Sequence, residues 1–268
     1  MRESESPIRS STAPMRFPAP LIEGRLVRRY KRFLADVTLA DGTVVTAHCA
    51  NPGAMLGLNA EGFRVLLSPS TNPTRKLGFS WELVEAELPG GLQWVGINTA
   101  RPNALVAEAF RENRLAPLAG YETLRPEVAY GKASRVDFLA SGGGLPPCHV
   151  EVKNCHLMRR PGLAEFPDCK AARSARHMEE LAGVVTAGGR AMLIVVVQMQ
   201  AEAFDVAHDI DPAFDRALRA ALAAGVEAYA YACAVGPEGV EIAEPVPILT
   251  SAAGSLRQND VKMFKGGC

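Results

Sequence analysis

The chain has 268 residues, and its 29 lysine and arginine residues balance 29 aspartate and glutamate residues, so the formal net charge is zero. Apolar residues make up 48% of the sequence, which excludes a disordered chain and predicts a globular protein of one large or two ordinary domains. A neutral chain lacks the overall basic excess typical of nucleic-acid-binding domains, so contacts with phosphates would depend on local basic clusters.

The first 14 residues are polar and rich in serine and proline, and we expect them to form a disordered extension. They contain no apolar core of a signal peptide, and the longest strongly apolar run, residues 191–197, is too short to span a bilayer. We therefore expect a cytoplasmic protein with no membrane partner. The six cysteines form no Cys-x-x-Cys pair, which indicates buried thiols rather than a zinc site or a disulfide framework.

Residues 15–91 predict a small β-barrel domain. Short β-type runs at 25–30, 33–39, 44–49, 63–68 and 78–88 are separated by turn signals such as Asp41-Gly42, and none has a helical period. Five strands in this length fit an oligonucleotide-binding (OB) barrel. Any other small barrel or sandwich remains an alternative.

A basic cluster marks the start of this barrel. If it contacts phosphates, the contacts would involve Arg28, Arg29, Lys31 and Arg32. Tyr30 and Phe33 alternate with these side chains and would either stack on bases or belong to the barrel core. The alternative for the charges is an ordinary solvated face.

Residues 92–250 predict a second domain of α/β type with a mixed sheet, and residues 251–268 a flexible tail. A helix is expected at 103–110, followed by strands at 124–130, 135–140 and 149–155. Further helices at 170–185 and 211–224 alternate with strands at 192–197 and 226–235. The chain as a whole is thus α+β. Neither a nucleotide-binding glycine loop nor a Gly-x-Ser-x-Gly elbow is present in the sequence.

Three residues of the second domain carry a pattern with chemical meaning. Asp137 lies in one apolar strand, and Glu151 and Lys153 lie in the next. Side chains two apart in a strand share a face and are separated by about 7 Å. Two carboxylates near a lysine are costly unless a cation completes the charge balance, and a divalent metal in that place can cut phosphodiester bonds. Because such short patterns also arise by chance, a solvated strand face is the alternative.

Assembled in this order, the second domain resembles the PD-(D/E)xK nuclease superfamily, in which a helix carries an acid and two strands carry Asp and Glu-x-Lys. The resemblance implies Glu108 as the helical acid, Glu108, Asp137 and Glu151 as ligands of Mg²⁺ or Mn²⁺, and Asp137, Glu151 and Lys153 as the catalytic residues.

The chain from residue 15 to about 246 is also similar to the sugar fermentation stimulation protein A family. This resemblance implies an OB-like barrel followed by a nuclease-like domain, and DNA binding. The segments that carry it are residues 29–37, 48–51, 53–55, 81–84, 95–99, 135–138 and 150–154.

Two segments depart from the family pattern. Asn51-Pro52-Gly53 stands where the family has Asn-Thr-Gly. In residues 171–177 the family's Thr, Gly and Lys are replaced, so phosphate contacts there would depend on Arg173, Arg176 and His177.

The sequence thus predicts a DNA-binding protein without marked sequence preference that carries a metal-dependent phosphodiesterase site. The first alternative is a regulator that binds DNA on a nuclease fold without cutting it. RNA, single-stranded DNA or an oligosaccharide remain further ligands for the barrel, and the sequence leaves the oligomeric state open.

Overall fold

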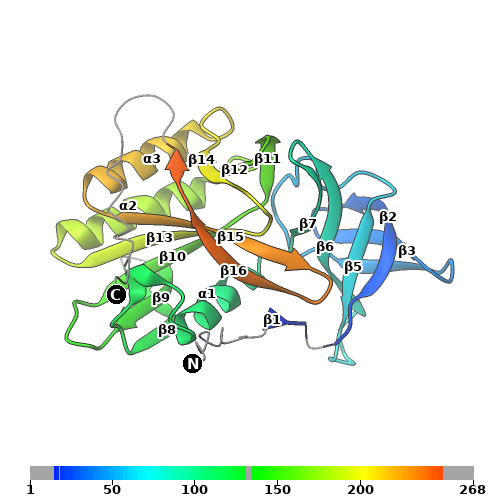
Figure 1. The fold of residues 1–268 in the computed structure, drawn as a ribbon, viewed down its shortest axis with the longest axis horizontal. Coiled ribbons are helices and arrows are strands. Elements are labelled where there is room, and N and C mark those ends of the chain that lie inside the picture. Colours follow the sequence, from blue (N-terminus) through cyan, green and yellow to red (C-terminus); the bar gives the residue numbers. More distant parts are fainter. Residues whose placement is uncertain (1–14, 18, 131–133, 250–268) are drawn as a thin grey trace, which may run out of the picture.

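The computed structural model describes residues 15–17, 19–130 and 134–249. The expectations for residues 1–14 and 251–268 lie outside these ranges. Within them the chain forms a barrel at one end and a larger mixed sheet with helices at the other, as Figure 1 shows.

The barrel consists of β2 (Ile22–Tyr30), β3 (Leu34–Leu39), β4 (Val44–His48), β5 (Arg64–Pro69) and β6 (Phe79–Leu88). A parallel pairing of Ala47 with Phe79 joins β4 to β6 and closes the five strands. Alternating side chains such as Val37, Val65 and Trp81 fill the interior without solvent exposure. The predicted five-stranded barrel is confirmed.

A sixth strand, β7 (Gly91–Gly96), was not expected. It forms a hairpin with β6 through Gly91, whose φ of 107° requires glycine at the turn. The sequence Pro89-Gly90-Gly91 predicts the end of the barrel, but in the structure it only reverses the chain. The extra strand leads from the barrel to the second part of the molecule.

The second part is built on a seven-stranded sheet in the order β1-β16-β15-β13-β10-β9-β8. Its central strand β13 pairs in parallel with β10 and β15, and the other neighbours are antiparallel, so the predicted mixed sheet is confirmed. The strand expected last is followed by β16, which returns beside it. The strands span Met15–Arg16 (β1), Thr123–Tyr130 (β8), Ser134–Ser141 (β9), Cys148–Cys155 (β10), Arg190–Val197 (β13), Glu227–Gly236 (β15) and Gly239–Val246 (β16).

Helices cover both faces of this sheet (Figure 1). Helix α1 (Arg101–Arg111) packs on one face, whereas α2 (Ala172–Thr186) and α3 (Pro212–Ala223) lie side by side on the other. Strand β13 therefore buries alternate side chains on opposite faces: Leu193 belongs to the core under α2 and α3, and Ile194 to the core under α1. A strand buried on both sides explains the continuous apolar run in its sequence.

A small second sheet joins β11 (Leu157–Arg160), β12 (Leu163–Phe166), β14 (Ala203–Val206) and β17 (Ile248–Leu249). Together with the short 3₁₀ helix at Ala116–Leu118, these elements were not expected. Each has too few residues to establish a periodic pattern along the sequence. None of the helices in the described ranges is long and apolar enough to cross a membrane.

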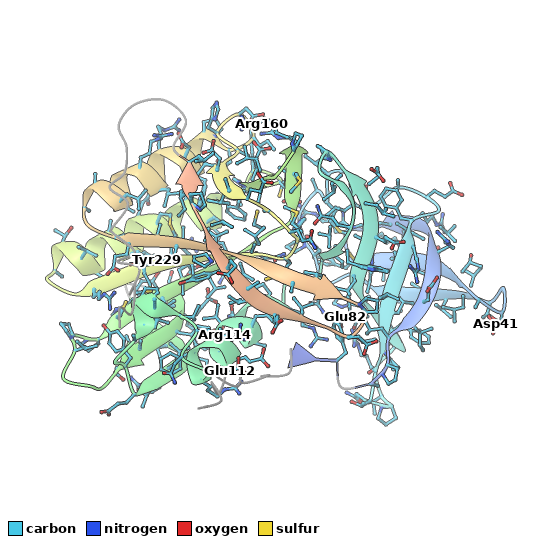
Figure 2. The ribbon with its side chains drawn as sticks, in the orientation of Figure 1. Asp41, Glu82, Glu112, Arg114, Arg160 and Tyr229 are labelled. Atoms are coloured by element: carbon cyan, nitrogen blue, oxygen red, sulfur yellow. The ribbon has the colours of Figure 1, made fainter. Side chains whose placement is uncertain are left out.

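Buried polar bonds tie the barrel to the larger sheet. The fully enclosed Glu82 of β6, labelled in Figure 2, accepts hydrogen bonds of 2.9 and 2.6 Å from Arg101 at the start of α1. The Met55 amide donates to Asp168 Oδ2 (2.7 Å), and a Cβ on Gly53 would lie only 2.5 Å from the same carboxylate. These contacts hold the barrel against the start of α1 and against the segment that leads into α2.

The two departures from the family pattern have local structural consequences. Pro52 sits inside a turn in which the Asn51 side chain accepts a bond from the Gly53 amide (2.9 Å), a place that suits the fixed φ of proline. Ala171 occupies the N-cap position of α2, where it makes no side-chain cap. With alanine at this position, the start of α2 has no side-chain cap, which is a less stable arrangement than a helix start capped by Ser, Thr, Asp or Asn.

Candidate functional site

The register of β9 and β10 brings two carboxylates together at the point where the strands separate. Phe138 pairs with Val150, so the next position along the ladder sets Asp137 opposite Glu151. There the backbone pairing ends, and the amide of Val152 donates to Asp137 Oδ2 instead (2.8 Å). At the candidate site the Asp137 carboxylate thus takes the place of a backbone carbonyl as the acceptor for the Val152 amide.

Asp137 is held from two sides. Besides the Val152 amide, the side chain of Asn103 in α1 donates to Asp137 Oδ1 (2.9 Å). Burial and the nearby charge of Glu151 nevertheless raise the pKa of Asp137 above its ordinary value. The ionised form of Asp137 therefore lowers the stability of the folded protein.

Glu151 is 1% exposed, and one of its oxygens has two hydrogen-bond partners in the site. Its Oε1 atom accepts hydrogen bonds from Lys153 Nζ and His177 Nδ1. Burial pushes the pKa of Glu151 upward, but these two partners outweigh it and hold the pKa below the ordinary value. The Oε2 atom is buried and has no hydrogen-bond partner among the described residues.

Helix α2 brings part of the second basic cluster to Glu151. Arg173 Nε donates to His177 Nε2 (3.2 Å), which leaves the imidazole proton on Nδ1, where it faces Glu151. Arg176 lies on the exposed side of the helix. Of the three residues singled out from the sequence, Arg173 and His177 thus join the carboxylates and Arg176 does not.

Glu108 does not join the cluster. It lies five residues after Asn103 in α1, about 140° around the helix axis, so it points away from Asp137. Burial and the charge of Glu112, labelled in Figure 2, raise its pKa, and the charge of Glu241 in β16 adds to this. The helical-acid assignment is therefore not supported by the geometry. The α1 residue beside Asp137 is Asn103, which no sequence signal had marked.

The four cations of the barrel have different surroundings. Arg28 forms an ion pair with Asp36 (2.9 Å), and Arg29 donates to the backbone oxygens of Asn51 (2.8 Å) and Gly53 (2.9 Å). Both side chains thus have partners in the barrel, and that of Arg28 is 67% exposed. Lys31 and Arg32 are exposed in the turn between β2 and β3, and neither forms an ion pair with a described residue.

The two aromatic residues of this region, Tyr30 and Phe33, also have different surroundings. Tyr30 donates its hydroxyl to Asp36 (3.1 Å) and carries the Arg28 guanidinium over its ring (4.8 Å), so it is part of the barrel wall. Phe33 is 44% exposed, and its ring lies nearly parallel to that of His48, with 6.5 Å between the centroids. Of the two, only Phe33 presents an open ring face near Lys31 and Arg32.

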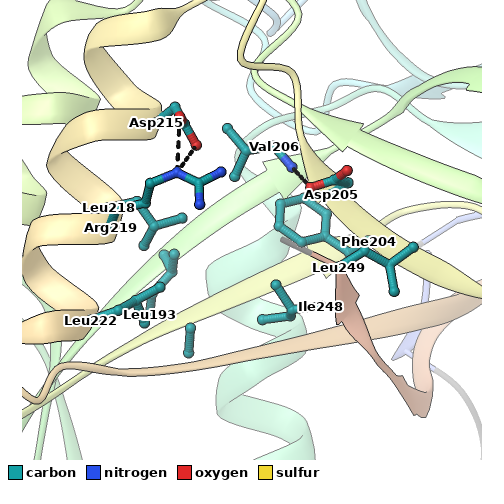
Figure 3. Close-up of a pocket in the computed structure, with 11 residues that line it drawn as sticks. Leu193, Phe204, Asp205, Val206, Asp215, Leu218, Arg219, Leu222, Ile248 and Leu249 are labelled. Carbon is teal, nitrogen blue, oxygen red and sulfur yellow. Dashed lines mark hydrogen bonds and ion pairs between the residues drawn. The ribbon is translucent and has the colours of Figure 1, made fainter. Parts of the chain in front are cut away.

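An apolar hollow between α3 and the small sheet, drawn in Figure 3, contains none of these residues. Phe204, Leu218 and Ile248 line it, and the ion pair of Asp215 with Arg219 (3.0 Å) lies at its side. The carboxylates in its lining, Asp205 and Asp215, are not among the candidate residues, so the hollow is not part of the candidate site.

Two family models match the chain, one described as the SfsA N-terminal OB domain over residues 27–97 and one as the sugar fermentation stimulation protein RE (restriction-endonuclease-like) domain over residues 100–239. The sugar fermentation stimulation protein homolog of Methylorubrum populi is 93% identical over 239 residues, which cover 89% of this chain and 97% of that protein. The homolog of Caulobacter vibrioides is 52% identical over 233 residues, which cover 87% of this chain and 96% of that protein.

Among solved structures, that of Pyrococcus furiosus SfsA in complex with Ca²⁺ matches with a TM-score of 0.78 and 24% identity, covering 88% of this chain and 98% of that one. This likeness concerns the fold. It agrees with the barrel and mixed sheet described above, and the family resemblance seen in the sequence is confirmed by the matching models.

Proposed function

We propose that this chain, which belongs to the sugar fermentation stimulation protein family, binds DNA without reading its sequence and cuts phosphodiester bonds with the help of a divalent metal. The observation that carries the proposal is the meeting of Asp137 and Glu151 at the end of a strand pair, with Lys153 bonded to Glu151. The restriction-endonuclease-like character of the matching domain supports the same class of reaction.

The donor atoms at Asp137 and Glu151 fit a hard divalent cation. Both are carboxylates, and Glu151 Oε2 is buried with no partner among the described residues. Mg²⁺ is commonly held by one or two carboxylates, with water and substrate phosphate completing its shell. We infer Mg²⁺ or Mn²⁺ as the cofactor, and the Ca²⁺ in the structure of the archaeal relative is consistent with a divalent ion. When bound, such an ion lowers the pKa of a water and polarises a phosphate oxygen.

The protein groups around the carboxylates have distinct roles in this proposal. Asn103 and the Val152 amide fix the direction of the Asp137 carboxylate. His177, which comes from α2 on the other face of the sheet, fixes the direction of the Glu151 carboxylate. The Lys153 ammonium provides positive charge to stabilise the charge that grows on the phosphate oxygens in the transition state.

The turn between β2 and β3 supplies the proposed DNA contact. Lys31 and Arg32 adopt φ values of 47° and 64°, a left-handed conformation that costs a non-glycine residue about 1 kcal/mol or more. Strained residues of this kind cluster at functional sites. The exposed ring of Phe33 beside them suits stacking with an unpaired base, whereas Arg173 would contact phosphate near Glu151.

Two observations favour the alternative of a DNA-binding regulator that does not cut. Lys153 and His177 both donate to the same oxygen of Glu151, so this carboxylate already has two partners. Within the described residues no three or more His, Cys, Asp or Glu side chains are grouped to hold a metal ion. A protein that binds DNA on a nuclease fold without cutting it would have the same contacts around Glu151.

The experiment is incubation of the protein with plasmid and single-stranded DNA in Mg²⁺, Mn²⁺ or EDTA. We expect metal-dependent cutting that Glu151→Gln and Lys153→Ala abolish, while Glu179→Gln, on the exposed side of α2, cuts like the wild type. A salt-sensitive gel shift without cutting in any metal would exclude the nuclease and leave the regulator. Absence of any shift would exclude both.

A further inference from the structure

Three segments that lie apart in the sequence, residues 29–34, 48–56 and 169–178, contain no acidic residue. The first and the last each have three lysine or arginine residues, and the second begins with His48. The formal net charge of the whole chain is zero, so these segments create a region of positive potential only if folding brings them together.

Hydrogen bonds join the three segments into one continuous surface, which we call the cationic surface. Arg29 Nε donates to the backbone oxygen of Arg32 (3.1 Å), and Arg29 Nη2 donates to that of Asn51 (2.8 Å). The Met55 amide, near the end of the second segment, donates to Asp168 Oδ2 (2.7 Å), one residue before the third segment. The cationic surface therefore extends from the barrel across to the start of α2.

Four cations of this surface are exposed and form no ion pair with a described residue. They are Lys31, Arg32, Lys170 and Arg173. The acid next to the third segment, Asp168, does not neutralise them, because its side chain is only 10% exposed and its Oδ2 atom already accepts from the Met55 amide. A positive surface without competing carboxylates suits the phosphates of a nucleic acid.

Cys169 lies where the barrel meets the third segment. Burial raises the pKa of the Cys169 thiol, and the charge of Asp168 adds to this, whereas a hydrogen bond from the Ala54 backbone and the charge of Arg32 act in the opposite direction. The Ala54 contact and the influence of Arg32 both come from the barrel. Of the cysteines in the described ranges, Cys169 alone is partly exposed, so its thiol can report on what covers this part of the surface.

Two aromatic rings form the barrel end of the surface. The side chain of Phe33 is 44% exposed, and its ring lies nearly parallel to the imidazole of His48, with 6.5 Å between the centroids. Burial lowers the pKa of His48, and the charge of Arg75 adds to this. An open ring stacks with a base whose face is free, and in a duplex the neighbouring base pairs cover these faces. The rings therefore favour a single strand over a duplex.

The other end of the surface reaches the candidate site. Arg173 donates to His177 (3.2 Å), and His177 contacts Glu151. Lys170 lies between the Asp168 contact with the barrel and the first turn of α2. Exposed cations thus follow one another along the surface between the rings and Glu151.

We propose that the cationic surface binds an unpaired DNA strand, which extends from the Phe33 ring past Cys169 and Lys170 to Glu151. A base stacks on Phe33, and the phosphates that follow it pair with Arg32, Lys170 and Arg173. This inference rests on the proposed function and names its substrate as single-stranded DNA. The barrel then determines which phosphodiester bond of the strand lies at the candidate site.

Modification of Cys169 by iodoacetamide tests whether a strand covers the middle of the surface. The protein is treated in EDTA, which prevents metal-dependent cutting, together with oligothymidylate or with a duplex of equal length. Mass spectrometry follows the modified peptide. We expect oligothymidylate to slow the reaction of Cys169 several-fold and the duplex to leave it unchanged.

Fluorescence anisotropy with labelled oligothymidylate tests the two ends of the path. Phe33→Ala should weaken binding by about 5- to 150-fold, the usual effect of losing one stacked base. Lys170→Gln should flatten the salt dependence by about 0.7, the effect of one lost phosphate contact. Arg125→Gln removes an exposed charge from β8, outside the cationic surface, and is the matched control that should bind as the wild type does. All three side chains are exposed, so the fold should persist, and thermal unfolding checks this.

Equal slowing of the Cys169 reaction by single strand and duplex, no slowing by oligothymidylate, or wild-type binding by both surface variants would overturn the inference. Metal-dependent cutting of DNA that persists in such a case would leave the proposed function standing. Slowing by the single strand alone, in a protein that cuts no DNA in any metal, would support the strand path and contradict the nuclease.

Discussion

Replacing Asp137 by Asn should stabilise the metal-free protein. Burial and the charge of Glu151 raise the pKa of Asp137, so its ionised form costs the folded state free energy at neutral pH. Asn is of the same size and has no charge. Its oxygen can accept from the Val152 amide, and the amide of Asn103 can turn to accept from its nitrogen.

The expected gain is on the order of 1 kcal/mol, the usual range when a functional-site cost is relieved. Its pH dependence follows from the raised pKa. The folded wild type holds the Asp137 proton more tightly than the unfolded chain, so its extra stability is present below the ordinary Asp pKa and is lost as pH rises through the raised value. Asp137→Asn escapes this loss, so its advantage should appear only above that window.

Urea unfolding from acidic to neutral pH in EDTA measures the difference. Asp41→Asn is a control, because Asp41 is exposed in the turn after β3 and hydrogen bonds from Thr43 lower its pKa (Figure 2). A variant less stable than the wild type at neutral pH, or a difference that does not change with pH, would refute the reasoning. With Mg²⁺ at a hundredfold excess over its dissociation constant the wild type should gain about 2.7 kcal/mol and the order should reverse.

Three further outcomes follow from single features of the structure. Ala171→Thr should raise the free energy of unfolding by about 1 kcal/mol, because it supplies the missing side-chain cap of α2, and a urea titration against Ala171→Val would show whether the hydroxyl is responsible. Gly53→Ala should lower the free energy of unfolding by about 1–3 kcal/mol, because its methyl group would overlap the Asp168 carboxylate; unchanged stability in thermal unfolding would contradict the close approach of the barrel. Replacing Lys31 and Arg32 together by glycine should stabilise the fold, since the left-handed turn suits glycine. The same change should weaken binding to single-stranded DNA and flatten its salt dependence by about 0.7 per lost phosphate contact; fluorescence anisotropy at several salt concentrations tests this, and an unchanged slope would remove the turn from the interface.

Much of the fold was predictable because it depends on local patterns. The five barrel strands and the three helices follow from runs and periods within single segments. The Asp211-Pro212 pair marked the start of α3, where Asp211 accepts hydrogen bonds from Ala213 and Phe214 (both 3.1 Å). Strands β11, β12, β14 and β17 were missed, since two to four residues carry no period, and they form only where other parts of the chain provide partners.

By itself the sequence determined the family, the order of barrel and mixed sheet, and the common face of Glu151 and Lys153, because strand alternation is a property of the local backbone. The tertiary structure decided which residues surround that pair. It brought Asn103 rather than Glu108 to Asp137, because the direction of a helical side chain toward another element depends on how the helix packs. It also gave Arg28 and Arg29 partners in the barrel and left Lys31 and Arg32 without an ion pair to a described residue, since partners such as Asp36 and the Asn51 carbonyl reach arginine side chains only after the chain has folded.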